Sequence, residues 1–152
     1  DYAHTPDAVA QALQALRPLT IYGNKRLWCV LGCGGDRDTS KRASMAEQAV
    51  DHADAVVFTS DNPRSEDPHS IVEQLMAAAL AHDQAPSKIV LQQVERAQAI
   101  AMAVAKASPG DVSLIAGKGH ENYQEIGGVR IPFSDVQVAS AALRTLRGST
   151  SL

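Results

Sequence analysis

The sequence predicts an α/β protein with a Rossmann-like, doubly wound and mostly parallel sheet. Four short apolar runs with the character of buried strands alternate with amphipathic helical segments along most of the chain. Such βαβ repeats form right-handed crossovers, which place helices on both faces of a parallel sheet. A Gly-Gly pair at 127–128 separates two further strand-like runs and predicts a hairpin that adds an antiparallel edge.

The first half of the chain predicts two helix–strand units. A capping threonine followed by proline starts the first helix, and apolar residues then recur at helical spacing over about 6–16. The apolar run at 27–31 ends in a glycine-rich loop, as expected of a buried strand. A helix over 40–53 and a strand over 55–59 follow it.

The second half repeats this pattern twice and closes the fold. An Asp-Pro pair begins a helix that runs to about residue 81, and a strand follows at 88–91. The helix over 96–107 is closed by a Pro-Gly pair and precedes a strand at 112–116. The remaining expected elements are hairpin strands at 123–126 and 129–131, a last helix from about 134 to 146, and a disordered tail at 148–152.

Length and composition fit one globular domain, expected over residues 1–147. The 152 residues are 45% hydrophobic and 20% charged, and no apolar run approaches the ~18 residues that a membrane helix needs. The net charge of −3 provides no basic field for nucleic acid. We therefore expect a monomer without membrane or nucleic-acid partners. Two cysteines without a metal or disulfide pattern fit the cytoplasm, and a chain opening on Asp1 is expected to be part of a longer protein.

Three polar loops follow strands and are expected to meet at one edge of the sheet. They cover residues 32–38, 61–64 and 117–121. The first loop is rich in glycine, but Arg37 stands where a dinucleotide fingerprint needs Gly or Ala, so dinucleotide binding is not favoured. Arg37 is a candidate for contact with a carboxylate or phosphate, and a simple tight turn is the alternative.

The second loop has the sequence Asp-Asn-Pro-Arg. Asp61 and Asn62 favour turns and Pro63 interrupts regular structure, but turn geometry does not require Arg64. A planar guanidinium suits bidentate carboxylate recognition, and an asparagine amide both donates and accepts hydrogen bonds. This loop predicts a site for an amino acid, which carries both a carboxylate and an ammonium.

The third loop, Gly-Lys-Gly-His-Glu, resembles part of a P-loop but lacks its spacing. Gly117 allows a ligand to approach the backbone, and Glu121 can accept hydrogen bonds from an ammonium. Several cations of the loops and the adjoining helix are expected to be accessible to a small anionic ligand, namely Arg37, Lys41, Arg42, Arg64 and Lys118.

Together these motifs resemble the C-terminal domain of the Mur ligases, in the branch that adds meso-diaminopimelate to UDP-N-acetylmuramoyl-L-alanyl-D-glutamate. The resemblance runs from the Asp-Tyr-Ala-His-Thr-Pro-Asp segment at 1–7 to the loop at 117–121. Asp-Asn-Pro-Arg is its most specific part, since lysine-adding relatives are expected to lack this arginine. The resemblance implies a diaminopimelate site made of Arg37, Asp61, Asn62, Pro63, Arg64, Gly117 and Glu121.

The family reaction implied by this resemblance belongs to peptidoglycan biosynthesis. ATP phosphorylates the D-glutamate side-chain carboxylate, and the amine of diaminopimelate attacks the resulting acyl phosphate. ATP and Mg²⁺ would be bound mainly by N-terminal and central domains absent from this chain, with Asp1 and His4 near ATP. The isolated chain is therefore expected to be inactive and to contain neither catalytic residues nor a metal site. The alternatives are a lysine-adding Mur ligase domain, a non-catalytic amino-acid-binding α/β module and a Rossmann-type oxidoreductase.

Overall fold

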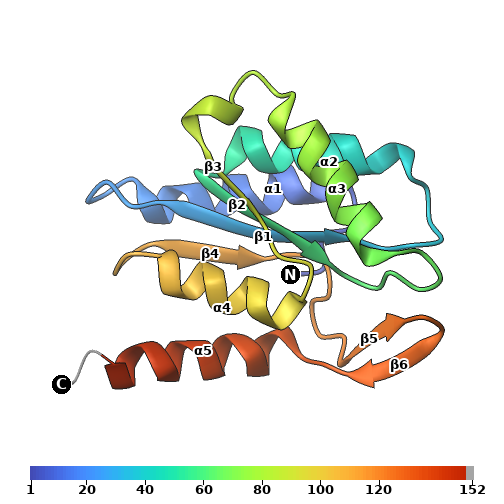
Figure 1. The fold of residues 1–152 in the computed structure, drawn as a ribbon. Helices are drawn as coiled ribbons and strands as arrows, with labels where there is room; N and C mark the ends of the chain where they lie inside the picture. The colour runs from blue at the N-terminus through green and yellow to red at the C-terminus, as the bar shows by residue number, and fades with distance from the viewer. Residues whose placement is uncertain (150–152) are drawn as a thin grey trace.

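Four parallel strands in the order β3-β2-β1-β4 form the central sheet of the computed structural model, which describes residues 1–149. Helices α1, α2 and α3 cover one face of the sheet, and α4 and α5 cover the other (Figure 1). This confirms the doubly wound α/β prediction. The strands are β1 (Leu27–Cys33), β2 (Ala55–Ser60), β3 (Ile89–Gln92), β4 (Val112–Ile115), β5 (Tyr123–Ile126) and β6 (Val129–Pro132). The helices are α1 (Pro6–Leu16), α2 (Ser40–His52), α3 (Pro68–Leu80), α4 (Arg96–Lys106) and α5 (Asp135–Ser149), with short 3₁₀ turns at Arg17–Thr20 and Ala85–Ser87.

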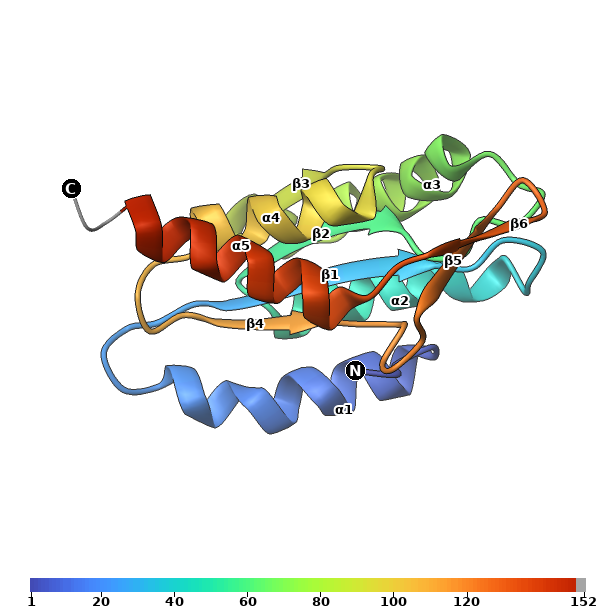
Figure 2. The ribbon, with the colours of Figure 1, turned by 90° about the horizontal axis from the view of Figure 1, so that it is seen from below.

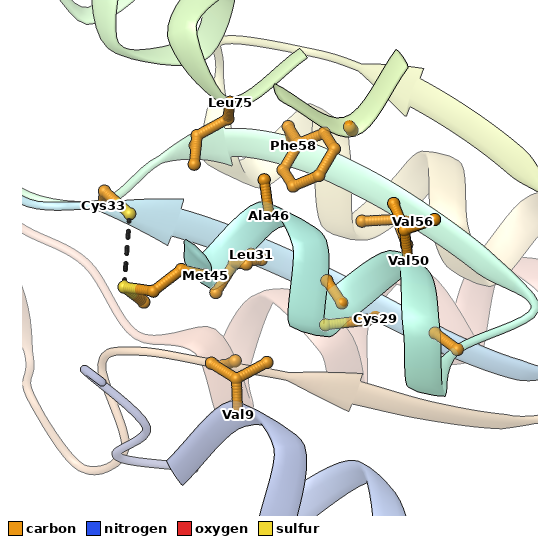
Figure 3. Packing of buried hydrophobic residues seen from close by; sticks show 14 of the residues in the cluster. Val9, Cys29, Leu31, Cys33, Met45, Ala46, Val50, Val56, Phe58 and Leu75 are labelled. Atoms are coloured by element: carbon orange, nitrogen blue, oxygen red, sulfur yellow. Dashed lines mark hydrogen bonds between the residues drawn. The ribbon is translucent and has the colours of Figure 1, made fainter. Parts of the chain in front are cut away.

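The core is divided into two layers by the alternation of side chains along β1. Cys29 and Leu31 face the α1–α3 side, whereas Trp28 and Val30 face α4 and α5. Every residue of β1 is buried, as expected of a parallel strand covered on both faces. Figure 3 shows the first layer, in which Met45 and neighbouring residues of α2 lie over β1 and β2.

Helix starts in the structure follow the predicted capping chemistry. The Thr5 side chain accepts a hydrogen bond from the Ala8 amide, and the Asp67 side chain accepts one from the His69 amide. Each cap is followed by proline at the first helical position. These caps fix where α1 and α3 begin, and therefore where the preceding loops must end.

Most element boundaries lie within one residue of the prediction, but two differ by more. Strand β1 runs two residues past the expected end, so Cys33 is a buried strand residue whose Sγ lies 3.6 Å from Met45 Sδ (Figure 3). Helix α5 continues through Gly148 and Ser149, which were expected in a disordered tail, and the Ser149 hydroxyl donates to Thr145 O at 3.0 Å. The rest of that tail lies outside the described residues.

The hairpin is the third correction, because β5 and β6 form a separate two-stranded sheet rather than an edge of the central sheet. It lies beyond the carboxyl ends of the central strands (Figures 1 and 2). Its main-chain partner there is Arg64, whose amide donates to Glu125 O at 2.9 Å and whose carbonyl accepts from Gly127 N at 2.7 Å. The hairpin therefore braces the loop after β2.

Candidate functional site

A cleft of about 570 Å³ lies at the carboxyl ends of the central strands. The loops after β1, β2 and β4 contribute to its walls, together with the segment that precedes α1. This confirms the expected meeting of the three loops at one edge of the sheet. The lining residues are Tyr2, His4, Thr5, Gly32, Cys33, Gly34, Arg37, Asp38, Lys41, Arg42, Met45, Asp61, Asn62, Arg64, Glu121 and Tyr123.

Six of the nine candidate site residues line the cleft, namely His4, Arg37, Asp61, Asn62, Arg64 and Glu121. The other three, Asp1, Pro63 and Gly117, do not line the cleft but lie in the segments that form it. Pro63 is buried in the turn, and its carbonyl accepts a hydrogen bond from Glu66 N. Gly117 has φ +111°, a conformation that L side chains rarely adopt, and its amide donates to Asp1 O at 2.9 Å.

The base of the cleft is a buried polar cluster that we call the floor, made of Asp61, Asn62, Lys118 and Glu121. Lys118 Nζ donates to Asn62 Oδ1 at 2.8 Å and to the Tyr123 carbonyl at 2.9 Å. The same Nζ lies 3.1 Å from Asp61 Oδ1 and 3.5 Å from Glu121 Oε2. Asn62 Nδ2 donates to Glu121 Oε2 at 3.2 Å, which closes the cluster.

The floor carries more negative than positive charge. Two carboxylates surround one ammonium, and the Lys118 side chain is 0% exposed. Although Lys118 is close to Asp61 Oδ1, the angles between them do not make a hydrogen bond, and this oxygen has no hydrogen-bond partner among the described residues. Asp61 Oδ1 is therefore paired with Lys118 by charge alone. The net negative charge of the two carboxylates and one ammonium suits a cationic donor such as a ligand ammonium.

This arrangement corrects the prediction that Lys118 and Arg42 are accessible to an anionic ligand. Lys118 is buried against carboxylates, and Arg42 is buried beside Glu66, whose Oε1 accepts from Arg42 Nη2 at 2.8 Å. The Arg42 hydrogen bond and the backbone amide of Asp36 hold the pKa of the Glu66 carboxyl below its ordinary value. Both cations are already neutralised within the protein.

The rim of the cleft supplies the accessible cations, which are Arg37, Lys41 and Arg64. Arg37 and Lys41 are exposed and make no hydrogen bond or ion pair with any described residue. The Arg64 side chain is 24% exposed; its Nη1 donates to Gly35 O at 2.8 Å, and its Nε lies 3.8 Å from Glu125 Oε2. Within residues 1–149, Arg64 Nη2 makes no hydrogen bond, so it can donate to a ligand carboxylate.

Local backbone geometry places Arg64 at the rim. Arg64 has φ +55°, and the hairpin hydrogen bonds described above hold it in this conformation. Gly35 lies against the carbonyl of Pro63, where any β-carbon would overlap that carbonyl, and its amide donates to Asn62 O at 2.8 Å. The first loop therefore packs directly on the second because residue 35 has no side chain.

The segment before α1 closes one side of the cleft. The Asp1 carbonyl accepts from both Gly117 N and Gly119 N at 2.9 Å, so this segment and the third loop are joined. Tyr2 Oη donates to Glu121 Oε1 at 3.3 Å, and the negative charge of Glu121 raises the pKa of the tyrosine hydroxyl. His4 Nδ1 lies 3.9 Å from Asp61 Oδ2. Asp1 itself does not line the cleft.

The supporting roles of two residues could not be predicted from the sequence. Lys118 was identified as a cation, but the orientation of its side chain depends on the φ of the flanking glycines, which is +111° at Gly117 and +56° at Gly119. Gln124 Nε2 donates to Asp61 O at 2.7 Å and to Ser60 Oγ at 3.1 Å, and it reaches them from the hairpin. It is the one buried residue of the hairpin strands, and this burial is visible only in the folded chain.

Other chemistries find no support in the described residues. Residues 1–149 contain no group of three or more His, Cys, Asp or Glu side chains placed to hold a metal ion. No helix among them has the length and apolar character needed to cross a membrane. What the cleft offers is an anionic floor and a cationic rim, an arrangement that suits a zwitterionic ligand.

Comparison with known proteins gives consistent results. Residues 1–119 match the family model described as "Mur ligase, glutamate ligase domain". A protein of Acidovorax sp. (strain JS42) named UDP-N-acetylmuramoyl-L-alanyl-D-glutamate--2,6-diaminopimelate ligase is 54% identical over 143 residues, which are 94% of this chain. A protein of the same name from Chromobacterium violaceum is 53% identical over 94% of the chain.

A solved structure supports the same similarity. The structure titled as a UDP-N-acetylmuramoyl-L-alanyl-D-glutamate--2,6-diaminopimelate ligase superposes with a TM-score of 0.84 at 44% identity over 97% of this chain. The chain spans only 28% of the length of the Acidovorax and Chromobacterium proteins and 29% of that solved chain. The similarity therefore concerns one part of these longer proteins.

Proposed function

The chain belongs to the Mur ligase family, and from this premise we propose that it is the amino-acid-binding C-terminal domain of a ligase that adds meso-diaminopimelate to UDP-N-acetylmuramoyl-L-alanyl-D-glutamate. The relatives that carry this name cover almost the whole chain at about half identity. The product is a precursor of peptidoglycan, and the cytoplasm is the proposed place of the reaction.

The observation that carries the proposal is the opposition of charges within one cleft. Asp61 and Glu121 lie at the floor, and Arg64 and Arg37 lie at the rim. Diaminopimelate has an amino acid group at each end, so the end that does not react presents both an ammonium and a carboxylate. We propose that the floor binds this ammonium and that Arg64, with Arg37, binds this carboxylate.

Arg64 favours diaminopimelate over the second candidate, lysine. Lysine has an ammonium but no carboxylate at its distal end, so it would leave Arg64 Nη2 without an acceptor in a partly buried place. A site built to bind a polar group discriminates strongly against an analogue that lacks that group. A non-catalytic amino-acid-binding module is not favoured, because the chain matches a ligase family along most of its length.

Each proposed site residue has a physical role in this scheme. Asp61 and Glu121 bind the distal ammonium. Asn62 has one Nδ2 hydrogen to offer, since the other is donated to Glu121 Oε2, and its Oδ1 already accepts from Lys118 Nζ and Glu125 N. Gly117 and Pro63 set the loop shapes. Holding the distal end in this way orients the other amine for attack on an acyl phosphate, with formation of an amide and release of phosphate.

ATP and Mg²⁺ are proposed for the complete protein. ATP would supply the phosphoryl group that activates the D-glutamate side chain, and Mg²⁺ would offset phosphate charge. The residues described here offer no metal-binding cluster, so we propose that both are bound mainly by parts of the longer protein that this chain does not cover. Asp1 and His4 would lie near the ATP, and a hinge at residues 1–5 would allow this domain to close over it. The complete enzyme would be a monomer, and the isolated chain would have no ligase activity.

A direct test is the ligase reaction of the full-length protein. With ATP, Mg²⁺ and UDP-N-acetylmuramoyl-L-alanyl-D-glutamate, we expect kcat/KM for meso-diaminopimelate to exceed that for L-lysine by at least about 100-fold. Equal use of lysine would overturn the choice of substrate. If the full-length protein joins neither amino acid to the UDP-linked dipeptide in the presence of ATP, the proposal as a whole is overturned.

A further inference from the structure

We propose that Lys118 is a positioning residue for amino acid selection: its buried ammonium holds Asp61, Asn62 and Glu121 in the arrangement that receives the ligand's ammonium. This inference rests on the proposed function. Lys118 was not among the predicted site residues, and its side chain does not line the cleft. It acts through the residues that do.

The geometry carries this role. Four oxygen atoms lie within 3.5 Å of Lys118 Nζ, and three of them belong to Asp61, Asn62 and Glu121. The fourth is the Tyr123 carbonyl, which anchors Nζ to the start of β5. The ammonium thus joins the loop after β2 to the loop after β4 and to the hairpin. Among the described residues, no other side chain has a hydrogen bond or ion pair with all three proposed ligand residues.

Charge makes the same argument independently. With Lys118 the floor has two carboxylates and one ammonium, which leaves one negative charge for one cationic group of the ligand. Without Lys118, the buried Asp61 carboxylate and the half-buried Glu121 carboxylate would lie close together with no cation between them, and Asn62 Oδ1 would lose one of its two donors. Like charges in a partly buried site repel each other. The floor would then lose the spacing on which ligand binding depends.

The test is Lys118→Met in the full-length protein, which removes the charge at nearly constant volume. We expect KM for meso-diaminopimelate to rise by roughly 10²-fold, the size of effect that small misplacements produce at such sites, while KM for ATP stays within about twofold. Lys106→Met is the matched control, because Lys106 is an exposed lysine at the end of α4. It should leave both constants unchanged.

A double-mutant cycle separates positioning from general destabilisation. If Lys118 acts through Glu121, then Lys118→Met and Glu121→Gln together should raise KM about as much as the more severe single change. A purely structural lysine would instead reduce the active fraction, which lowers kcat for all substrates and leaves KM unchanged. Multiplicative effects in the cycle, or an unchanged KM for meso-diaminopimelate in Lys118→Met, would overturn the inference.

Two further outcomes are informative. If Lys118→Met does not fold, then Lys118→Gln, which keeps a donor but removes the charge, decides the question by the same KM comparison; if neither folds, Lys118 is required for the fold and the positioning role is overturned. A wild-type enzyme that does not use meso-diaminopimelate would refute the proposed function itself. If the wild-type enzyme uses meso-diaminopimelate and the Lys118 variants have the same KM for it, only the role of Lys118 is refuted.

Discussion

The two ends of the central sheet both carry a polar cavity, but the carboxylates in the two cavities have different partners. The cavity at the amino ends of the strands is the larger, at about 750 Å³ against about 570 Å³ at the carboxyl ends. Within residues 1–149, the only buried side-chain atoms without a hydrogen-bond partner are Arg42 Nε and Asp61 Oδ1, and both residues line the carboxyl-end cleft.

At the amino ends, polar side chains serve the fold. Asp54 Oδ2 accepts from Arg17 Nη1 at 2.6 Å and from Leu27 N at 2.8 Å. Asp111 accepts from Arg26 N, Ser108 N and Trp28 Nε1. These carboxylates accept backbone hydrogen bonds just before β2 and β4 begin. The two ends therefore differ in what their carboxylates do: those at the amino ends accept hydrogen bonds within the fold, whereas we propose that Asp61 and Glu121 at the carboxyl ends bind a ligand.

The largest effect that would test this contrast is expected from Arg64→Ala in the full-length enzyme. Removal of the guanidinium should raise KM for meso-diaminopimelate by about 100-fold, or about 3 kcal/mol, because the distal carboxylate loses its partner. Lysine never had this contact, so discrimination between the two amino acids should fall to within about fivefold. Steady-state kinetics with both substrates measure this.

Arg64→Lys is the matched control for Arg64→Ala. It retains the positive charge but loses the planar fork, so its KM should lie between those of the wild type and Arg64→Ala. Discrimination against lysine that persists unchanged in Arg64→Ala would remove Arg64 from the specificity role.

Asp54→Ala should show the opposite behaviour at the amino ends. It removes a pair of hydrogen bonds made to a charged group, so urea unfolding of the chain should show a loss of about 1–2 kcal/mol, reduced because the side chain is about one-third exposed. In the full-length enzyme, KM for meso-diaminopimelate should stay within about twofold. A large rise in KM with normal stability would indicate that this end also takes part in binding.

The pH dependence of stability should sharpen the same distinction by a smaller amount. Burial raises the pKa of Asp54, but hydrogen bonds from Arg17 and Leu27 outweigh it and hold the pKa below its ordinary value of 3.8. A lowered carboxyl pKa contributes stability above the unfolded-state value, and that contribution is lost as pH falls through the folded-state value. Asp54→Asn should therefore lose less stability than wild type between pH 5 and about pH 2.5. Parallel pH curves for the two proteins would contradict this.

The smallest effect is expected from Lys25→Ala, which also lines the amino-end cavity. Its Nζ donates to the exposed Pro109 carbonyl at 2.8 Å, a bond that water can replace. Stability should change by less than about 0.5 kcal/mol, with no change in KM for any substrate. A loss of activity in this variant would mean that the larger cavity also has a function in the reaction.

Much of the site followed from sequence because its position depends on a general rule. Parallel strands bring their following loops to one edge, so the meeting of Arg37, Asp61 and Glu121 required only correct strand assignment. The directions of the Lys118 and Arg64 side chains could not be predicted from the sequence. The burial of Lys118 depends on the backbone angles of its flanking glycines, and the bracing of Arg64 depends on a hairpin whose sequence shows which strands pair but not where they dock.

The most direct test is a crystal structure of the full-length protein with meso-diaminopimelate. The account predicts that the distal ammonium lies within about 3.2 Å of an oxygen of Asp61 or Glu121, and that the distal carboxylate accepts from Arg64 Nη2. An amino acid bound at the amino ends of the strands, or one whose distal carboxylate lies away from Arg64, would contradict it.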